Sequence, residues 1–406
     1  MTTHRNPPFR AEHLGSLLRP KEFLEKRAAF EKKGLSQEDI TKAEDEAITK
    51  VVDVQTEIGF RAVSDGEYRR AVFWGTFFEE LEGMTEIRNP SMDIFRPYVP
   101  DIAGFIEKGH KPGQSCVCTG KIRHKGESTL VGQFEFLKTL IPKERWGDVK
   151  VTMIAPPWYH LRYKDGLAYP KDVYANNEEY LWDIAQAYRA ELDILYAALD
   201  IPPLETKNIT YPAHLLDFCS EKMLAGWAED KSNTKTPDEL LDAYIKCYND
   251  SIANHSSKMH FGLHICRGNF MGSRHFSEGG YDRIATKLFQ TLNVATYYLE
   301  YDTPRAGGFE PLLHLPSHKN VILGVITSKF PELEDKEGMK ERIYAAVDVM
   351  AKGAGQTRGE ALRRMGVSPQ CGFASHEEGN LLGWEDMKNK LKLVRSIADE
   401  IWPGEP

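Results

Sequence analysis

Hydrophobic and polar positions follow two different periods along this chain, one typical of helices and one typical of strands. Within 36–58, apolar residues recur every three or four positions, and Ser36 stands before them as a candidate N-cap. The same spacing predicts helices over 176–197, 237–254, 281–292, 337–353 and 385–400. Short apolar runs predict strands over 59–63, 149–154, 258–266, 293–300, 320–327 and 365–369. Because strands alternate with helices, we expect a parallel sheet covered by helices.

The fold class that this alternation favours is α/β, as a closed (β/α)8 TIM-type barrel with N-terminal and loop insertions. No linker interrupts the chain, so residues 1–406 are predicted to form a single barrel domain. Insertions account for the length, since such barrels usually need ~250 residues and can exceed 400. A doubly wound open sheet is the alternative, but no G-x-G-x-x-G follows the first predicted strand. In a barrel, residues just after each strand form the active site.

Composition and charge exclude several classes of protein. The formal net charge of −8 disfavours nucleic acid as a partner, because phosphate binding needs a basic surface. No apolar run approaches the ~20 residues of a membrane span. The first residues lack the apolar core of a secretory signal, so we expect a cytoplasmic protein, with homo-oligomer formation left open. Six cysteines are too few for a disulfide scaffold and are expected to be reduced thiols.

Candidate metal ligands follow three of the predicted strands. His264 and Cys266 lie two residues apart, so both point to the same face of their strand. Glu300 ends the strand 293–300, and Cys371 follows the strand 365–369. Taken singly, these residues are ordinary: a packed His–Cys pair, a surface carboxylate and a buried thiol. In a barrel the strand ends meet, and together these groups form a ligand set that zinc accepts.

The formal charge of such a site indicates its chemistry. Two thiolates, one carboxylate and Zn²⁺ sum to about −1, which makes the metal a poor Lewis acid toward water. The metal can still bind an incoming thiol, lower its pKa and keep it nucleophilic. The residues therefore favour S-alkylation over hydrolysis.

The sequence resembles the cobalamin-independent methionine synthase family, specifically its C-terminal catalytic barrel and its short stand-alone homologues. The resemblance spans nearly the whole chain. It is carried by HLGSLLRP at 13–20, SDGEYRR at 64–70, HIC at 264–266, LEYDTPRAGGFEPL at 299–312 and VSPQCGF at 367–373. It implies a (β/α)8 barrel in which zinc activates a thiol, homocysteine in the synthase. On this resemblance the zinc ligands are His264, Cys266, Glu300 and Cys371.

The resemblance also assigns substrate-binding residues. Leu14, Gly15 and Ser16 match the loop that holds the amino acid part of homocysteine, and Glu67 matches the carboxylate that pairs with its ammonium group. Without the resemblance, Gly15 and Ser16 would be interpreted as a turn and Glu67 as a surface ion pair. Residues beside predicted strand ends are further candidates for the pocket lining, although aromatic residues there fit a core equally well: Asp65, Trp74, Trp158, Tyr159 and His160.

Two departures from the family pattern concern the residue that helps hold the substrate amine and the residue that serves the folate donor. Segment 199–217 lacks the family's acidic strand motif, and its three prolines make it a poor central strand; Asp200, Glu205 and Asp217 are candidate substitutes for the missing acid. In the synthases a histidine five residues after the glycine of Gly324-Val325 serves in proton transfer, and here that position is Lys329. We therefore take Glu67 and Lys329 as candidate catalytic residues and consider donors other than methyltetrahydrofolate.

The predicted function is a zinc-dependent thiol S-alkyltransferase of the methyltransferase type, with a role in methionine biosynthesis implied by the resemblance. Its partners would be a small thiol and a methyl or alkyl donor. The alternatives are an enzyme that forms or cleaves a C–S bond on another thiol, such as an epoxide:thiol transferase or a lyase, and an inactive zinc-binding homologue. A porphyrinogen decarboxylase resembles the same barrel but needs no metal, and His264, Cys266 and Cys371 argue against it.

Overall fold

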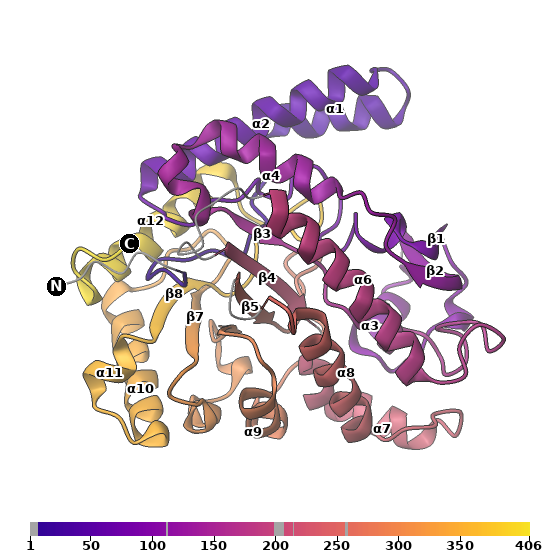
Figure 1. Cartoon of the computed structure of the whole chain (residues 1–406). Coiled ribbons are helices and arrows are strands. Elements are labelled where there is room, and N and C mark those ends of the chain that lie inside the picture. Colours follow the sequence, from indigo (N-terminus) through magenta and orange to yellow (C-terminus); the bar gives the residue numbers. More distant parts are fainter. Residues whose placement is uncertain (1–6, 111–112, 199–206, 214, 256–258) are drawn as a thin grey trace.

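The computed structural model describes residues 7–110, 113–198, 207–213, 215–255 and 259–406. Six parallel strands form its main sheet (Figure 1), and they follow one another in chain order. Their bounds are β3 (Lys150–Thr152), β4 (Lys207–Ala213), β5 (Met259–Ile265), β6 (Thr296–Glu300), β7 (Asn320–Ile326) and β8 (Met365–Pro369). A doubly wound sheet would reverse its strand order at a switch point, so this topology excludes that alternative for the described residues.

Two further segments extend the sheet by one residue pair each. Ala11 forms a parallel bridge with Val367 of β8, and Val63 forms one with Val149, just before β3. The predicted strand 59–63 is therefore reduced to a single bridge. The described residues do not form an uninterrupted ladder of eight strands, so what is established is an α/β fold with a parallel sheet.

The prediction that segment 199–217 makes a poor central strand is wrong for its described part. β4 pairs with β3 from Asn208 to Thr210 and with β5 along its whole length. Pro212 is tolerated because β3 ends before it, so only β5 pairs with the strand at that point. The candidate substitutes Asp200 and Glu205 lie outside the described residues. Asp217 is buried and accepts a hydrogen bond from Ser277 Oγ at 2.8 Å.

Helices surround the sheet (Figure 1), and long helices such as α2, α8 and α12 bury apolar residues spaced three or four positions apart. α2 begins at the capping box of Ser36 and Asp39 and ends at Gly59, whose φ of +95° suits glycine. The α-helices are α1 (Lys21–Glu31), α2 (Gln37–Ile58), α3 (Pro100–Glu107), α4 (Thr129–Leu140), α5 (Trp158–Arg162), α6 (Asn177–Ala198), α7 (Glu221–Glu229), α8 (Pro237–Ile252), α9 (Asp282–Thr291), α10 (Lys336–Ala354), α11 (Arg358–Leu362) and α12 (Trp384–Ile401). The helices predicted from periodicity are present within two residues at each end.

Smaller elements were not predicted from the sequence. An antiparallel pair, β1 (Glu82–Arg88) and β2 (Gln114–Arg123), stands apart from the main sheet. Short 3₁₀ helices are η1 (Phe78–Glu80), η2 (Met92–Ile94), η3 (Lys143–Asp148), η4 (Leu215–Cys219), η5 (Pro304–Ala306) and η6 (Glu310–His314).

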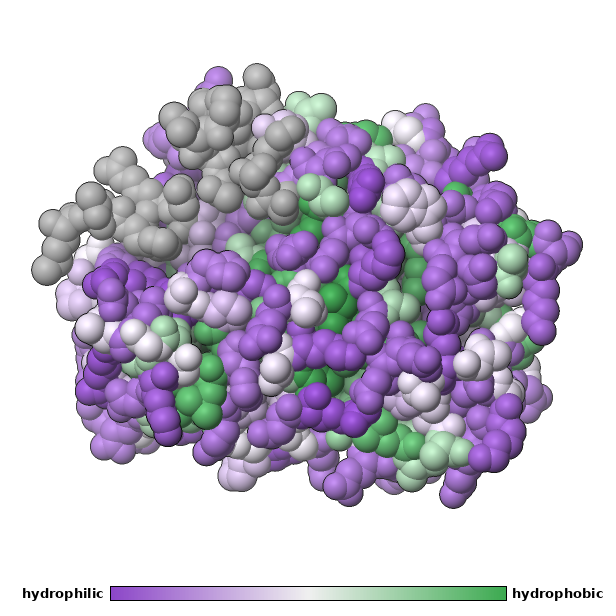
Figure 2. All heavy atoms as spheres, turned by 60° about the horizontal axis from the view of Figure 1, so that its bottom comes forward, coloured by the Kyte–Doolittle hydropathy of each residue, from purple (hydrophilic) through white to green (hydrophobic). Residues whose placement is uncertain are grey.

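Burial is complete along the central strands and low on the outer surface. Every residue of β5, β6 and β8 is buried, as expected for parallel strands covered on both faces. The face that turns the bottom of Figure 1 toward the viewer is mostly hydrophilic, with small separate hydrophobic areas (Figure 2). None of the helices in the described ranges has the length and apolar character that crossing a bilayer requires.

Candidate metal centre and active-site cavity

Three of the four predicted metal ligands lie together at the carboxyl ends of β5 and β8. One ligand atom each from His264, Cys266 and Cys371 lies within 4.8 Å of the others. His264 Nε2 is 3.4 Å from Cys371 Sγ, and Cys371 Sγ donates a hydrogen bond to Cys266 Sγ over 3.7 Å. The strands bring these residues together because parallel strand ends share one edge of the sheet.

The donor set fits a zinc ion. His264 Nδ1 donates to the carbonyl oxygen of Tyr298 at 3.1 Å, which leaves Nε2 available as a ligand. The hydrogen bond from Cys371 and the nearby His264 hold the pKa of Cys266 well below its ordinary value, despite burial. The same hydrogen bond, together with burial, raises the pKa of Cys371. The pair therefore resembles a thiolate beside a thiol, and a metal cation would replace the shared proton.

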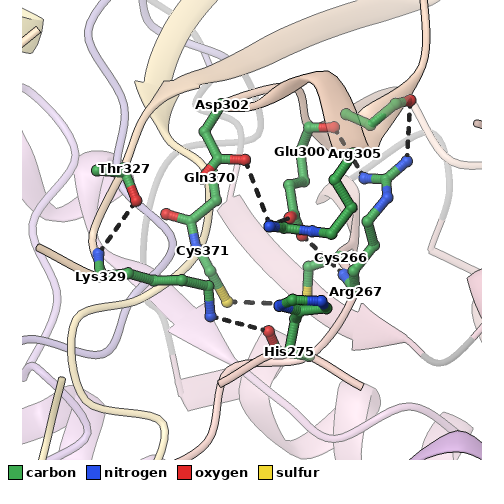
Figure 3. Close-up of polar contacts among 12 residues, drawn as sticks. Cys266, Arg267, His275, Glu300, Asp302, Arg305, Thr327, Lys329, Gln370 and Cys371 are labelled. Atoms are coloured by element: carbon green, nitrogen blue, oxygen red, sulfur yellow. Dashed lines mark hydrogen bonds and ion pairs between the residues drawn. The ribbon is translucent and has the colours of Figure 1, made fainter. Parts of the chain in front are cut away.

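Glu300, the fourth predicted ligand, lies beside this trio but outside it. Its Oε2 accepts a hydrogen bond from the backbone N–H of Arg267 at 2.7 Å, and its Oε1 pairs with Arg305 Nη2 at 2.7 Å (Figure 3). Burial raises the pKa of Glu300, and the negative charge of Cys266 adds to this effect. The carboxylate is therefore engaged by protein partners in this structure.

Lys329 is buried and does not line the cavity described below. Its Nζ donates to Gly268 O, Asn269 Oδ1 and Arg274 O, each at 3.1 Å. Burial lowers its pKa, although nearby Cys371 opposes the shift. Because all three protons of an ammonium group have acceptors, this geometry ties Lys329 to the loop after β5.

A cavity opens beside the three ligands, and its volume is about 690 Å³ when the adjoining space open to solvent is included. Of the predicted substrate-binding residues, Leu14, Ser16, Glu67 and Trp158 line it, and so do His264, Cys266 and Cys371. Gly15 is not one of the lining residues and packs closely against Thr152. Its φ is +117°, and a Cβ at this position would lie 2.4 Å from Thr152 Cγ2. Asp65 lines a smaller, separate pocket, and its Oδ1 accepts a hydrogen bond from the backbone N–H of Glu67 at 2.8 Å.

Glu67 lines this cavity and has one carboxylate oxygen without a hydrogen-bond partner among the described residues. Its Oε1 accepts from Thr152 Oγ1 at 2.7 Å and pairs with Arg70 Nη2 at 2.8 Å. Its Oε2 is buried and has no hydrogen-bond partner among the described residues. The backbone φ of Glu67 is +65°, a conformation unusual for a residue with a side chain. Such strain is typical of functional positions.

Aromatic residues form the other side of the cavity. Trp74 and Trp158 stack with ring centroids 5.8 Å apart, and the Arg162 guanidinium lies over Trp158 at 4.6 Å. Sequence reasoning named both tryptophans but missed Arg162. It also missed further lining residues, because most of them lie in loops and insertions without periodicity: Phe73, Phe105, Asn269, Phe270, Phe276 and Ser375.

Two other residues proposed as pocket lining are core residues instead. Tyr159 and His160 are buried away from this cavity in α5. The ring nitrogens of His160 lie 2.8 Å from Tyr244 Oη and 3.1 Å from Asn177 Oδ1. Burial lowers the pKa of His160 to about 4, which keeps the ring neutral. This histidine therefore has a packing role.

Solved structures with a similar fold come from two bacteria. One is a protein of Listeria monocytogenes provisionally assigned as a vitamin-B12 independent methionine synthase, with a TM-score of 0.69, 24% identity and coverage of 98% of this chain and 99% of that one. The other is a B12-independent methionine synthase from Shewanella sp. W3-18-1 in complex with selenomethionine, with a TM-score of 0.63, 17% identity and 97% coverage of both chains. At these identities the likeness establishes a shared fold.

Sequence comparison gives a closer relationship. A scan against protein-family models finds no match. Two Bacillus subtilis (strain 168) proteins, YxjH and YxjG, both named as uncharacterized, are each 33% identical to this chain over 402 and 400 residues. These alignments cover 98% of this chain and 96% of each relative. The chain therefore belongs to the same family as YxjH and YxjG.

Proposed function

We propose that this protein is a zinc-dependent thiol S-alkyltransferase of the methyltransferase type, similar to methionine synthase. The observation that carries the proposal is the trio of His264, Cys266 and Cys371 in the wall of a cavity that is also lined by Glu67, with its unpaired carboxylate oxygen. A soft ligand trio suits a thiol substrate, and the buried carboxylate suits a substrate amine. The fold shared with methionine synthases supports this assignment.

Different residues of this chain would act on the two reactants, the thiol substrate and the alkyl donor. Bound zinc would supply the positive charge that lowers the pKa of an incoming thiol and keeps it nucleophilic. Glu67 Oε2 would accept a hydrogen bond from the ammonium group of homocysteine and so orient its sulfur toward the ligand trio. The wall of Trp74 and Trp158 would hold the donor opposite. The C–S bond forms on the substrate as the donor's bond to the alkyl group breaks, and positioning in line supplies much of the rate.

The donor need not be methyltetrahydrofolate. The synthases' proton-transfer histidine is replaced by Lys329, whose three protons already have acceptors in the loop 268–274. This geometry favours a donor whose leaving group needs no proton from that position. It also supports a second candidate function, in which the protein forms or cleaves a C–S bond on another small thiol.

We further propose that the sheet closes into the predicted (β/α)8 barrel as one domain. The bridges of Ala11 and Val63 extend β8 and β3, the two edges of the sheet. Between these segments, His13 Nε2 lies 3.1 Å from Ala62 O, and Ser64 Oγ donates to Gly15 O at 2.9 Å. These side-chain contacts cross the position where a barrel seam would lie.

The test is zinc per chain in purified protein, beside the variant Cys371→Ser. We expect about one zinc in the wild type, lost or weakened in the variant, and a zinc absorption edge that changes when homocysteine is added. Cys219→Ser is the matched control, because Cys219 is a free thiol outside the trio and should leave zinc unchanged. A wild-type protein without zinc, even after reconstitution under reducing conditions, would contradict the proposal.

A further inference from the structure

Arg305 lies between two buried carboxylates beside the ligand trio. Its Nη2 is 2.7 Å from Glu300 Oε1 and 3.7 Å from Asp302 Oδ1, and the three side chains are 16%, 0% and 1% exposed. Figure 3 shows the Arg305 guanidinium within reach of both acidic side chains. One cation thus serves two carboxylates that water reaches poorly.

The two carboxylates differ in the hydrogen-bond donors available to them. Glu300 has Arg305 on one oxygen and the backbone N–H of Arg267 on the other. Both oxygens of Asp302 are buried without a hydrogen-bond partner among the described residues. The nearby guanidinium of Arg342 contacts the backbone carbonyls of Tyr301 and Asp302 instead of this carboxylate. A buried carboxylate without hydrogen bonds is costly, so Asp302 is a ready second partner for Arg305.

The other hydrogen bond to the Glu300 carboxylate comes from the backbone N–H of Arg267, a residue whose side chain is held by several hydrogen bonds. The side chain of Arg267 donates from Nε to Gly279 O at 2.9 Å, from Nη2 to Ala306 O at 3.1 Å and from Nη1 to Glu300 O at 3.1 Å. Its backbone N–H, next to Cys266 in the chain, therefore stays aimed at Glu300 whichever way Arg305 turns. Of the two contacts to the Glu300 carboxylate, only the one from Arg305 has an alternative partner within reach.

We infer that Arg305 is a positioning residue that exchanges between Glu300 and Asp302 and thereby decides whether Glu300 is free to bind the metal. This inference rests on the proposed zinc site. With Arg305 on Glu300, only His264, Cys266 and Cys371 would hold the metal, which would leave room for the substrate sulfur. With Arg305 on Asp302, the carboxylate of Glu300 would be free to act as the fourth ligand. One guanidinium cannot neutralise both carboxylates, so the carboxylate that lacks it is the one left for another cation.

The experiment measures the zinc dissociation constant by competition with a chromophoric chelator, and the ligand atoms by zinc X-ray absorption. In Arg305→Gln the carboxylate of Glu300 is released, so we expect zinc to bind roughly tenfold or more tightly, the usual size of effects from outer partners of metal ligands. The absorption spectrum should gain an oxygen ligand. In Asp302→Asn the alternative partner is lost and Arg305 stays on Glu300, so zinc should bind more weakly. The two variants are thus expected to shift affinity in opposite directions.

Two controls separate this exchange from a general disturbance. Arg283→Gln removes a surface arginine paired with Asp238 and should leave zinc affinity unchanged. In a Glu300→Gln background, Arg305→Gln should no longer tighten zinc binding, because no carboxylate remains to be released.

The inference is overturned if zinc binds the wild type and Arg305→Gln leaves its affinity unchanged or weakens it. If Arg305→Gln does not fold, Asp302→Asn decides alone, and unchanged or tighter zinc binding there overturns the inference. Zinc absent from the wild type and from every variant overturns the proposed function, and this inference with it.

Discussion

Gly324 in β7 lies directly against Gln370, the residue before Cys371. A Cβ at Gly324 would come 2.6 Å from Gln370 Cα and 3.0 Å from the carbonyl oxygen of Leu299. Gly324 therefore lies between the end of β6, which carries Glu300, and the residues just after β8, which include Cys371. The spacing of the ligand-bearing strand ends depends on a residue without a side chain.

The variant Gly324→Ala should displace the chain at Gln370 and Cys371. We expect a loss of unfolding free energy of about 1–3 kcal/mol, typical of an overpacked core, together with weaker zinc binding. Urea unfolding and zinc content measure the two effects. Gly132→Ala is the matched control, because it lies in α4 with open space around it and should be neutral or slightly stabilising. Full zinc content in Gly324→Ala would show that the strand ends adjust freely.

The variant Glu67→Gln should weaken binding of an amino thiol. A charge-assisted hydrogen bond contributes about 1.5–3 kcal/mol, so we expect the dissociation constant of homocysteine to rise roughly tenfold to a hundredfold. Calorimetry with homocysteine and with a thiol of similar length that lacks the amine measures the effect. The second thiol should bind wild type and variant alike. Equal losses for both thiols would show that Glu67 acts on the fold instead; Glu25→Gln, at an exposed position, is the control variant.

Free thiols should differ sharply in reactivity in zinc-free protein. Cys266 and Cys219 are both half-buried, but hydrogen bonding from Cys371 lowers the pKa of Cys266 while burial raises the pKa of Cys219 to about 12. We expect iodoacetamide at neutral pH to alkylate Cys266 first, as mass spectrometry of peptides can show. Added zinc should protect Cys266. Alkylation of Cys219 at the same rate would contradict this assignment of the thiolate.

Acid should destabilise the zinc-free protein through buried histidines. Burial lowers the pKa of His160 to about 4, below the ~6.5 of an unfolded chain. Between these values the unfolded state binds more protons, so unfolding free energy falls as pH falls from about 6.5 toward 4. The loss from pH 7 to 5 is about 2 kcal/mol for this one residue. Urea unfolding against pH should show a shallower fall in His160→Gln, and an unchanged fall in the control variant His318→Gln, at an exposed position.

Local sequence determined the elements that carry the ligands. The apolar runs before His264, Glu300 and Cys371 predict buried strands, and the two-residue period of a strand puts His264 and Cys266 on the same face. Parallel strands then bring their ends to one edge, so the sequence predicted a group of four ligands, and three of them lie together in the structure. The prediction for segment 199–217 was wrong because it took prolines as evidence against a central strand. Pro212 is accepted because β3 ends before this position, so β4 pairs only with β5 there.

Tertiary structure decided which groups face each other across those ends. Nothing in the spacing of Glu300 and Arg305 shows that they form an ion pair, or that Asp302 lacks hydrogen bonds, because both depend on how loops fold after the strands. The same holds for Lys329, which the sequence placed at a catalytic position and the fold ties to the loop after β5. Strand identity follows from local hydrophobic pattern, whereas the partner of a buried charge follows from long-range packing, which one-dimensional periodicity does not encode.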